Sequence, residues 1–257
     1  MNNSSVPAGQ PAAEPVIRRV AAGRIGAWLA AGWGDLVANP IPSLAYGLLF
    51  GIGGDLILLA SLGRPHLFTA ALSGFFLLAP LLAVGLYELS RQHAAGTRPT
   101  FIDTLAAFRG NGRSIALFAL VLGTITLIWE RASSIGFGLL GGTTGINVKQ
   151  FIAQAVANSD NSIFLILWFV IGGTLALVTF ALSVVSVPLM LDRDAHFVTA
   201  IVASLRAFVA NTTTLLLWAA TIVMLTLLGF ATLLFGLVVI MPVLGHASWH
   251  AYRDLVE

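Results

Sequence analysis

The chain has 257 residues, of which 58% are hydrophobic and 9% are charged, and its mean hydropathy is +0.92. Soluble domains carry roughly a quarter charged residues, so these few charges could not cover a water-facing surface, and we expect a polytopic helical membrane protein. The net charge of +2 comes without a clustered basic face, which excludes a nucleic-acid patch. The absence of Cys excludes disulfides, thiolate metal sites, iron–sulfur clusters and c-type haem attachment.

In chain order, residues 1–17 are polar and rich in Ala and Pro, which predicts a disordered cytoplasmic tail. Residues 18–257 form a single membrane domain. A spanning helix needs about 20 mostly apolar residues, and six segments qualify. The last two come from one apolar stretch that we divide near Gly229. The predicted spans are about 41–61, 67–89, 113–130, 162–188, 212–228 and 231–250.

The basic residues predict the orientation. With the N-terminus inside, ten of the 13 Lys and Arg residues lie on the inner side, and Arg64, Arg131 and Lys149 lie outside. This bias follows the positive-inside rule. We therefore expect a multi-pass protein of a bacterial inner membrane, with both termini in the cytoplasm.

A short sequence motif, which consists of spaced apolar residues followed by Asn and which we call the phrase, occurs three times. Each copy precedes a long apolar stretch. The spacing of i, i+4 and i+7 or i+8 predicts a short amphipathic helix in the membrane interface, with its apolar face inward. The Asn can end one helix or cap the next. The copies are Ile25, Leu29, Trp33, Leu36 and Asn39; Phe101, Leu105, Phe108 and Asn111; and Phe197, Ile201, Leu205, Phe208 and Asn211.

These phrases predict an all-α fold of three helical hairpins, each preceded by an interfacial amphipathic helix. The repeats cover about 20–95, 97–193 and 195–257. The second helix of each hairpin, which runs back to the cytoplasmic side, carries a Pro towards its cytoplasmic end. This Pro removes one backbone hydrogen bond and can bend the helix. These are Pro80, Pro188 and Pro242.

The middle hairpin departs from the repeat by an external loop at about 132–160, which is rich in Gly. Two readings stay open for it. Long loops in compact proteins are often functional, which favours a lid, a re-entrant segment or a docking surface. The alternative is a flexible external loop.

Asp55 is the candidate intramembrane functional carboxylate, because a charged group inside a spanning helix is costly and marks a functional site by default. In the alternative reading the helix breaks at Gly53 and Gly54, which leaves Asp55 in the outer interface. Glu130 and Arg131 end the third span and are interpreted as a pair at the outer interface.

His246, His250 and Asp254 share one face of the last helix, and His93 and His196 lie on the same side of the membrane. Two His at i, i+4 can share a metal, but three residues strung over about 12 Å of one helix cannot reach one ion. We interpret this face as an interfacial polar surface. We assign no metal ligand, cofactor or catalytic residue, since the chain has no P-loop, nucleophile elbow, zinc-protease motif or dinucleotide fingerprint.

The chain resembles a family of bacterial integral membrane proteins of unknown function with six predicted spans. The resemblance is carried by residues 39–85, by Phe108-Arg109, by residues 187–192 and 203–211, and by Met241-Pro242 and residues 251–254. It implies no catalytic residue. We expect a non-enzymatic scaffold, assembly factor or accessory subunit; a transporter or channel for a small solute, ion or lipid is the alternative. The expected partners are the lipid bilayer and other membrane proteins, without nucleic acid.

Overall fold

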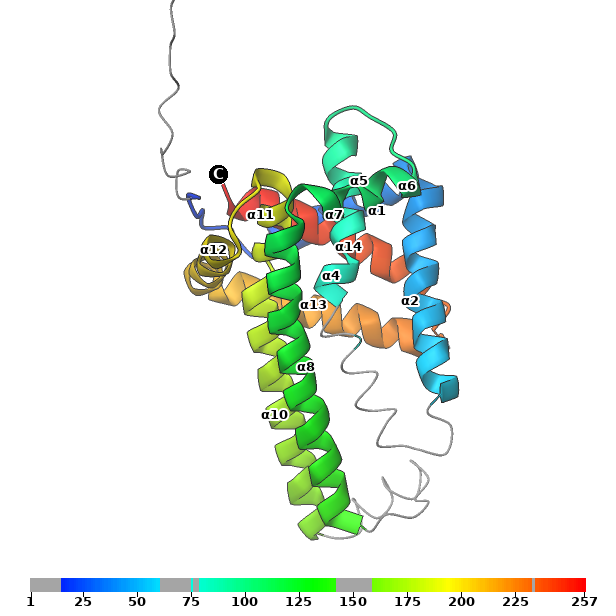
Figure 1. Cartoon of the computed structure of the whole chain (residues 1–257), viewed down its shortest axis with the longest axis vertical. Coiled ribbons are helices and arrows are strands. Elements are labelled where there is room, and N and C mark those ends of the chain that lie inside the picture. The colour runs from blue at the N-terminus through cyan, green and yellow to red at the C-terminus, as the bar shows by residue number, and fades with distance from the viewer. Residues whose placement is uncertain (1–14, 61–74, 76–78, 142–158, 233) are drawn as a thin grey trace, which may run out of the picture.

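The computed structural model describes residues 15–60, 75, 79–141, 159–232 and 234–257 (Figure 1). These residues are helical apart from short connections, and they contain no strand, which confirms the all-α class. The helices are α1 (Arg24–Ala38), α2 (Pro40–Ala60), α4 (Ala79–Leu82), α5 (Val84–Ala94), α6 (Phe101–Leu105), α7 (Ala107–Gly110), α8 (Gly112–Gly141), α10 (Ser159–Ser183), α11 (Ser186–Arg193), α12 (Phe197–Ala210), α13 (Thr212–Ala231) and α14 (Leu237–Leu255).

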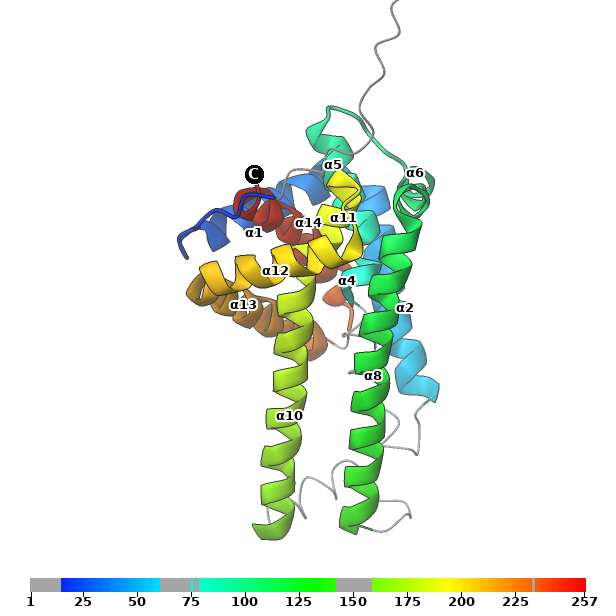
Figure 2. The same ribbon diagram turned by 60° about the vertical axis from the view of Figure 1, so that its left-hand side comes forward.

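The helices follow two main directions (Figures 1 and 2). Helices α8 and α10 lie against each other along the long axis and extend well beyond the other helices, and α2 runs in a similar direction. Helices α1, α12, α13 and α14 run across this axis at the opposite end of the molecule. The buried core is at that end, where α14 packs on α1, α2 and α5.

Four segments are long and apolar enough to cross a membrane, and they coincide with the first, third, fourth and fifth predicted spans. They are Pro40–Ile57, Gly112–Ile135, Ile166–Arg193 and Thr212–Ala231. The second predicted span, 67–89, lies largely outside the described residues. The sixth, 231–250, corresponds to α14, which is not among these four because its second half is polar.

Two predicted boundaries can be compared with the helices. The break near Gly229 is confirmed, because α13 ends at Ala231 and α14 begins at Leu237. The predicted loop at 132–160 begins later than expected, because α8 continues without interruption to Gly141. Residues 142–158 lie outside the described residues, as do residues 1–14 of the predicted tail. The end of that tail is ordered against the C-terminal segment, since Ile17 forms an antiparallel bridge with Val256.

Matching apolar positions of the three amphipathic helices lie outside the buried core. Trp33, Leu105 and Leu205, which occupy matching positions in the three phrases, are 53%, 45% and 41% exposed. These side chains point away from the core because small residues on another face of each helix make the closest contacts. Gly32 in α1 allows the α14 backbone to approach closely, and α12 packs through Ala200, Ala203 and Ala207. Close approach of small residues adds van der Waals contact that a large side chain would prevent.

Candidate functional site

Six polar side chains from four helices meet in the core beneath α1. We call them the Asp35 cluster: Asp35 of α1, Ser43 of α2, Ser90 and His93 of α5, and His246 and His250 of α14. Asp35, Ser43, Ser90 and His246 are almost completely buried, with at most 5% exposure. The side chains of His93 and His250 are 41% and 30% exposed. The cluster therefore has a closed end and an open end.

Glycines bring these four helices together. A Cβ atom on Gly32 of α1 would lie 2.6 Å from the carbonyl oxygen of Val243 in α14, and a Cβ atom on Gly47 of α2 would collide with the carbonyl of Val238. On α14, Gly245 lies against Leu86 of α5. The contacts of α14 with α1, α2 and α5 thus each depend on the absence of one side chain.

Hydrogen bonds link the cluster into one chain. The Ser43 Oγ lies 2.9 Å from the Nε2 of His246, and the Nδ1 of the same ring lies 2.7 Å from the Ser90 Oγ. Ser90 donates to Asp35 Oδ2 over 2.6 Å, and the Nε2 of His250 lies 2.9 Å from the same oxygen. The Nε2 of His93 approaches Asp35 Oδ1 at 3.8 Å. All these distances except the last are those of ordinary hydrogen bonds.

The environment fixes the charge on the two buried titratable groups of the Asp35 cluster, which lie in α1 and α14, outside the four candidate spans. Burial alone would raise the pKa of Asp35, but the hydrogen bonds from His250 and Ser90 and the nearby imidazoles lower it overall. Burial lowers the pKa of His246 to about 4, although the Asp35 charge opposes this shift. At neutral pH, Asp35 is therefore a carboxylate and His246 is a neutral imidazole.

These protonation states assign a direction to the hydrogen bonds. A carboxylate only accepts, so the single Ser90 proton points to Asp35. The Nδ1 of His246 must then carry the ring proton and donate it to Ser90, which leaves Nε2 to accept from Ser43. Chemically, the cluster can hold a proton or pass one along a row of groups that both donate and accept.

The polar face predicted on the last helix is divided between two sites. His246 and His250 reach Asp35, whereas Asp254 accepts from the Trp28 indole over 2.7 Å and pairs with Arg24 over 2.9 Å. Sequence reasoning identified the two His residues but missed Asp35, Ser43 and Ser90. In the described part of the chain, no group of three or more His, Asp and Glu side chains is arranged to hold a metal ion.

The predicted carboxylate sites lie elsewhere. Asp55 is exposed on the second half of α2, which continues through Gly53 and Gly54 without a break. The Glu130 Oε2 and the Arg131 Nε lie 2.8 Å apart on α8, and Ser134 donates to the other Glu130 oxygen. None of these residues belongs to the Asp35 cluster.

The three predicted asparagines each end a helix. Asn39, Asn111 and Asn211 lie between consecutive helices with φ angles of −131°, −112° and −130°. Two of them also hold a distant segment. The Asn111 amide donates to the carbonyls of Met190 and Ala195, before α12.

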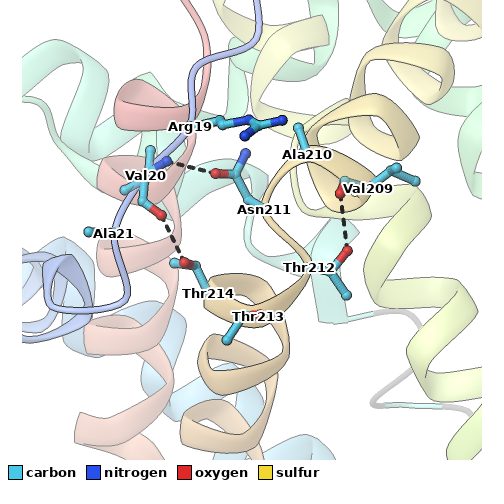
Figure 3. Close-up of a pocket in the computed structure, with 9 residues that line it drawn as sticks. All are labelled: Arg19, Val20, Ala21, Val209, Ala210, Asn211, Thr212, Thr213 and Thr214. Atoms are coloured by element: carbon cyan, nitrogen blue, oxygen red, sulfur yellow. Dashed lines mark hydrogen bonds between the residues drawn. The ribbon is translucent and has the colours of Figure 1, made fainter.

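Asn211 makes the corresponding contacts with the segment before α1, at an open cavity of about 500 Å³ (Figure 3). Its amide donates to the Arg18 carbonyl, and its oxygen accepts from the backbone N–H of Val20. Thr214 donates to the Val20 carbonyl. The cavity is lined by residues 19–21 and 209–214 and contains no member of the Asp35 cluster.

The three predicted prolines occupy different positions in their helices. Pro80 is in the short helix α4, and Pro188 is in the first turn of α11, after the break that follows α10. Pro242 is inside α14, where it cannot donate to the Val238 carbonyl that faces Gly47. Only this last proline lies at a contact that shapes the Asp35 cluster.

Residues 67–192 match the model of a family described as a predicted integral membrane protein, DUF2189. Over these residues the chain is similar to that family. The resemblance to an uncharacterised integral membrane family is thereby confirmed. The DUF2189 segment contains Ser90 and His93, whereas Asp35, Ser43, His246 and His250 lie outside it. No match was found among curated proteins or solved structures.

Proposed function

We propose that this protein is a non-enzymatic integral membrane protein that transports an ion, and that the Asp35 cluster is the site that handles the ion. The buried Asp35 carboxylate, connected through His250 and His93 to the surface, is the observation that supports this proposal. Within transmembrane segments, ionisable groups are costly and typically mark ion pathways or proton relays, and the Asp35 cluster reaches one candidate span through Ser43 of α2. Perturbed, coupled ionisable groups are also typical of functional sites.

A scaffold or accessory subunit is the second candidate function. The outward faces of α1 and α12, which are not candidate spans, carry large apolar side chains such as Trp33, Val37 and Val209. These faces suit another membrane protein or the acyl chains of lipids. The scaffold proposal predicts a stoichiometric protein partner after gentle extraction, and recovery of only lipid and identical chains would count against it.

We further propose that the chain repeats one unit three times in a ring. The amphipathic helix that begins each unit, which we call its entry helix, packs on the second half of another unit: α1 on α14, α6 on α5, and α12 on α10 and α11. The Asn contacts support the same relation. The amides of Asn111 and Asn211 reach the carbonyls of Met190 and Arg18, each seven residues before the first apolar residue of an entry helix.

The proposed topology has both termini on the cytoplasmic side of a bacterial inner membrane. The pairing of Ile17 with Val256, and of the Arg18 N–H with the Leu255 carbonyl over 2.9 Å, supports a common side for the two ends. A common side requires an even number of crossings. The positive-inside bias supports the cytoplasm as that side.

Flux measurements on reconstituted vesicles test the transport function. The full chain is inserted into lipid vesicles, and the fluxes of H⁺, Na⁺ and K⁺ are followed with ion-sensitive dyes. We expect one of these fluxes to fall by more than about tenfold in Asp35→Asn, as for loss of a proton-transfer group. Asp55→Asn is the matched control, because this carboxylate is exposed and outside the cluster. Absence of all three fluxes, or an unchanged flux in folded Asp35→Asn, would contradict the proposal.

A further inference from the structure

We propose that the ion is a proton, relayed along Ser43, His246, Ser90 and Asp35 and exchanged with solvent through His250 and His93. This inference rests on the proposed transport function and names its substrate. It concerns residues from four helices, most of them outside the segment that matches the family.

The arrangement of the cluster favours a proton over a metal cation. Cations such as Na⁺ or K⁺ need several oxygen ligands that converge on one point. Here the polar atoms form a line, because Ser43 and Ser90 contact opposite nitrogens of the His246 ring. Each of these three groups can both donate and accept a hydrogen bond, which is the property that a proton relay requires.

One proton passes along the line by linked transfers. A hydronium ion at Ser43 gives a proton to its Oγ as the Ser43 hydroxyl proton moves to His246 Nε2. The Nδ1 proton of His246 moves to Ser90 Oγ, and the Ser90 proton moves to Asp35 Oδ2. Once Asp35 is protonated, the His250 ring proton moves from Nε2 to Nδ1 through water, Asp35 gives its proton to the freed Nε2, and the resulting imidazolium releases the Nδ1 proton to water. One proton enters and one leaves, and turning of the hydroxyls and exchange of the His246 tautomer restore the first state.

Groups from every packed helix influence this route. Helix α5 contributes His93, α14 contributes His246 and His250, and α2 contributes only the neutral Ser43 hydroxyl. Asp254, paired with Arg24 of α1, acts electrostatically on the far side of His250. The open end of the relay is therefore surrounded by imidazoles and one further carboxylate, which can supply or accept the transferred proton.

The two ends of the relay differ in access. His93 and His250 are partly exposed, whereas Ser43 is fully buried on α2, a candidate spanning helix. In a proton-coupled transporter the two ends must not be open at once, because a relay open at both ends leaks. The structure is the state closed at Ser43, and movement of α2 against α14 would open that end.

Proton flux through reconstituted full-length protein tests the relay, using a pH-sensitive dye inside the vesicles and an imposed potential. Ser90→Ala removes the hydroxyl that joins His246 to Asp35 by hydrogen bonds and leaves their direct distance of 4.0 Å, so it should lower the flux by more than about tenfold. Ser90→Thr keeps a hydroxyl and should retain the flux. The wild-type flux should also slow in D₂O. Ser186→Ala is the control, since Ser186 is a buried hydroxyl on α11 that binds the Leu182 carbonyl.

Two results would overturn the relay and leave the transport function intact. One is a Na⁺ or K⁺ flux that depends on Asp35 without any proton flux. The other is wild-type proton flux in folded Ser90→Ala. Absence of any ion flux would contradict both proposals.

The tautomer of His246 gives a second test that does not require transport. Nitrogen-15 NMR of labelled histidine in the detergent-solubilised wild type should show a neutral ring protonated on Nδ1 at neutral pH. A ring protonated on Nε2, or a charged ring, would overturn the direction of the hydrogen bonds on which the relay depends.

Discussion

His246 should make the folded protein sensitive to mild acid. Its pKa is lowered to about 4 in the folded state by burial, and its usual value is 6.5. Between these values the unfolded chain binds more protons than the folded chain, so stability is present above pH 6.5 and is lost as the pH falls towards 4. Since one pKa unit corresponds to about 1.4 kcal/mol, the loss is on the order of 3 kcal/mol.

His246→Gln removes this titration and keeps a polar side chain at the site. Unfolding in detergent micelles, followed by tryptophan fluorescence at about pH 7 and about pH 4.5, compares the variant with the wild type. We expect the variant to be less stable at neutral pH, because it disturbs the contacts with Ser43 and Ser90, but also less sensitive to acid. Titration of Asp35 does not contribute to this difference. Its pKa is lowered in the folded protein, so its protonation destabilises the fold only at lower pH.

His196→Gln serves as the control for histidine replacement, because His196 is exposed at the start of α12 and outside the cluster. This variant should keep the acid sensitivity of the wild type. The reasoning is refuted if His246→Gln loses as much stability between the two pH values as the wild type does.

Two further predictions concern the contacts that position the helices. Gly47→Val should prevent α2 from packing on the Val238 carbonyl, and size-exclusion chromatography should show loss of the folded state. Gly26→Ala is the control and should fold normally, because open space surrounds Gly26. Equal behaviour of the two variants would refute the close approach of α2 and α14. Asn211→Ala removes three backbone contacts and should cost about 1–3 kcal/mol. It should also speed proteolysis near Arg18, and unchanged cleavage would show that this amide does not hold the segment.

Four of the predicted spans correspond to candidate spans in the described residues, and they could be predicted because apolar length is a local property. The stretches that begin near Ile41, Arg113 and Thr212 all proved helical over the expected residues. The predicted break near Gly229 also agreed, since α13 ends shortly after it. The residues through which the entry helices pack on the core were less predictable. Trp33 fits the apolar spacing, but the close approach at Gly32 turns it outward, and this approach depends on the partner helix.

The Asp35 cluster could be predicted only in part. The i, i+4 spacing of His246 and His250 showed that they share a face, and this was visible in the sequence. Their carboxylate partner was not, because Asp35 lies 215 positions from His250 and is surrounded by apolar residues in an entry helix. Asp254 seemed the natural partner by spacing, but Arg24 and Trp28 bind it instead. A carboxylate in an otherwise apolar helix face was the one available signal.

The most direct test of the account is the ion flux of reconstituted wild type, Asp35→Asn and Asp55→Asn measured side by side. The account predicts flux in the wild type, loss in Asp35→Asn and wild-type flux in Asp55→Asn. Equal flux in the wild type and folded Asp35→Asn, or loss only in Asp55→Asn, would contradict the assignment of the Asp35 cluster as the ion-handling site.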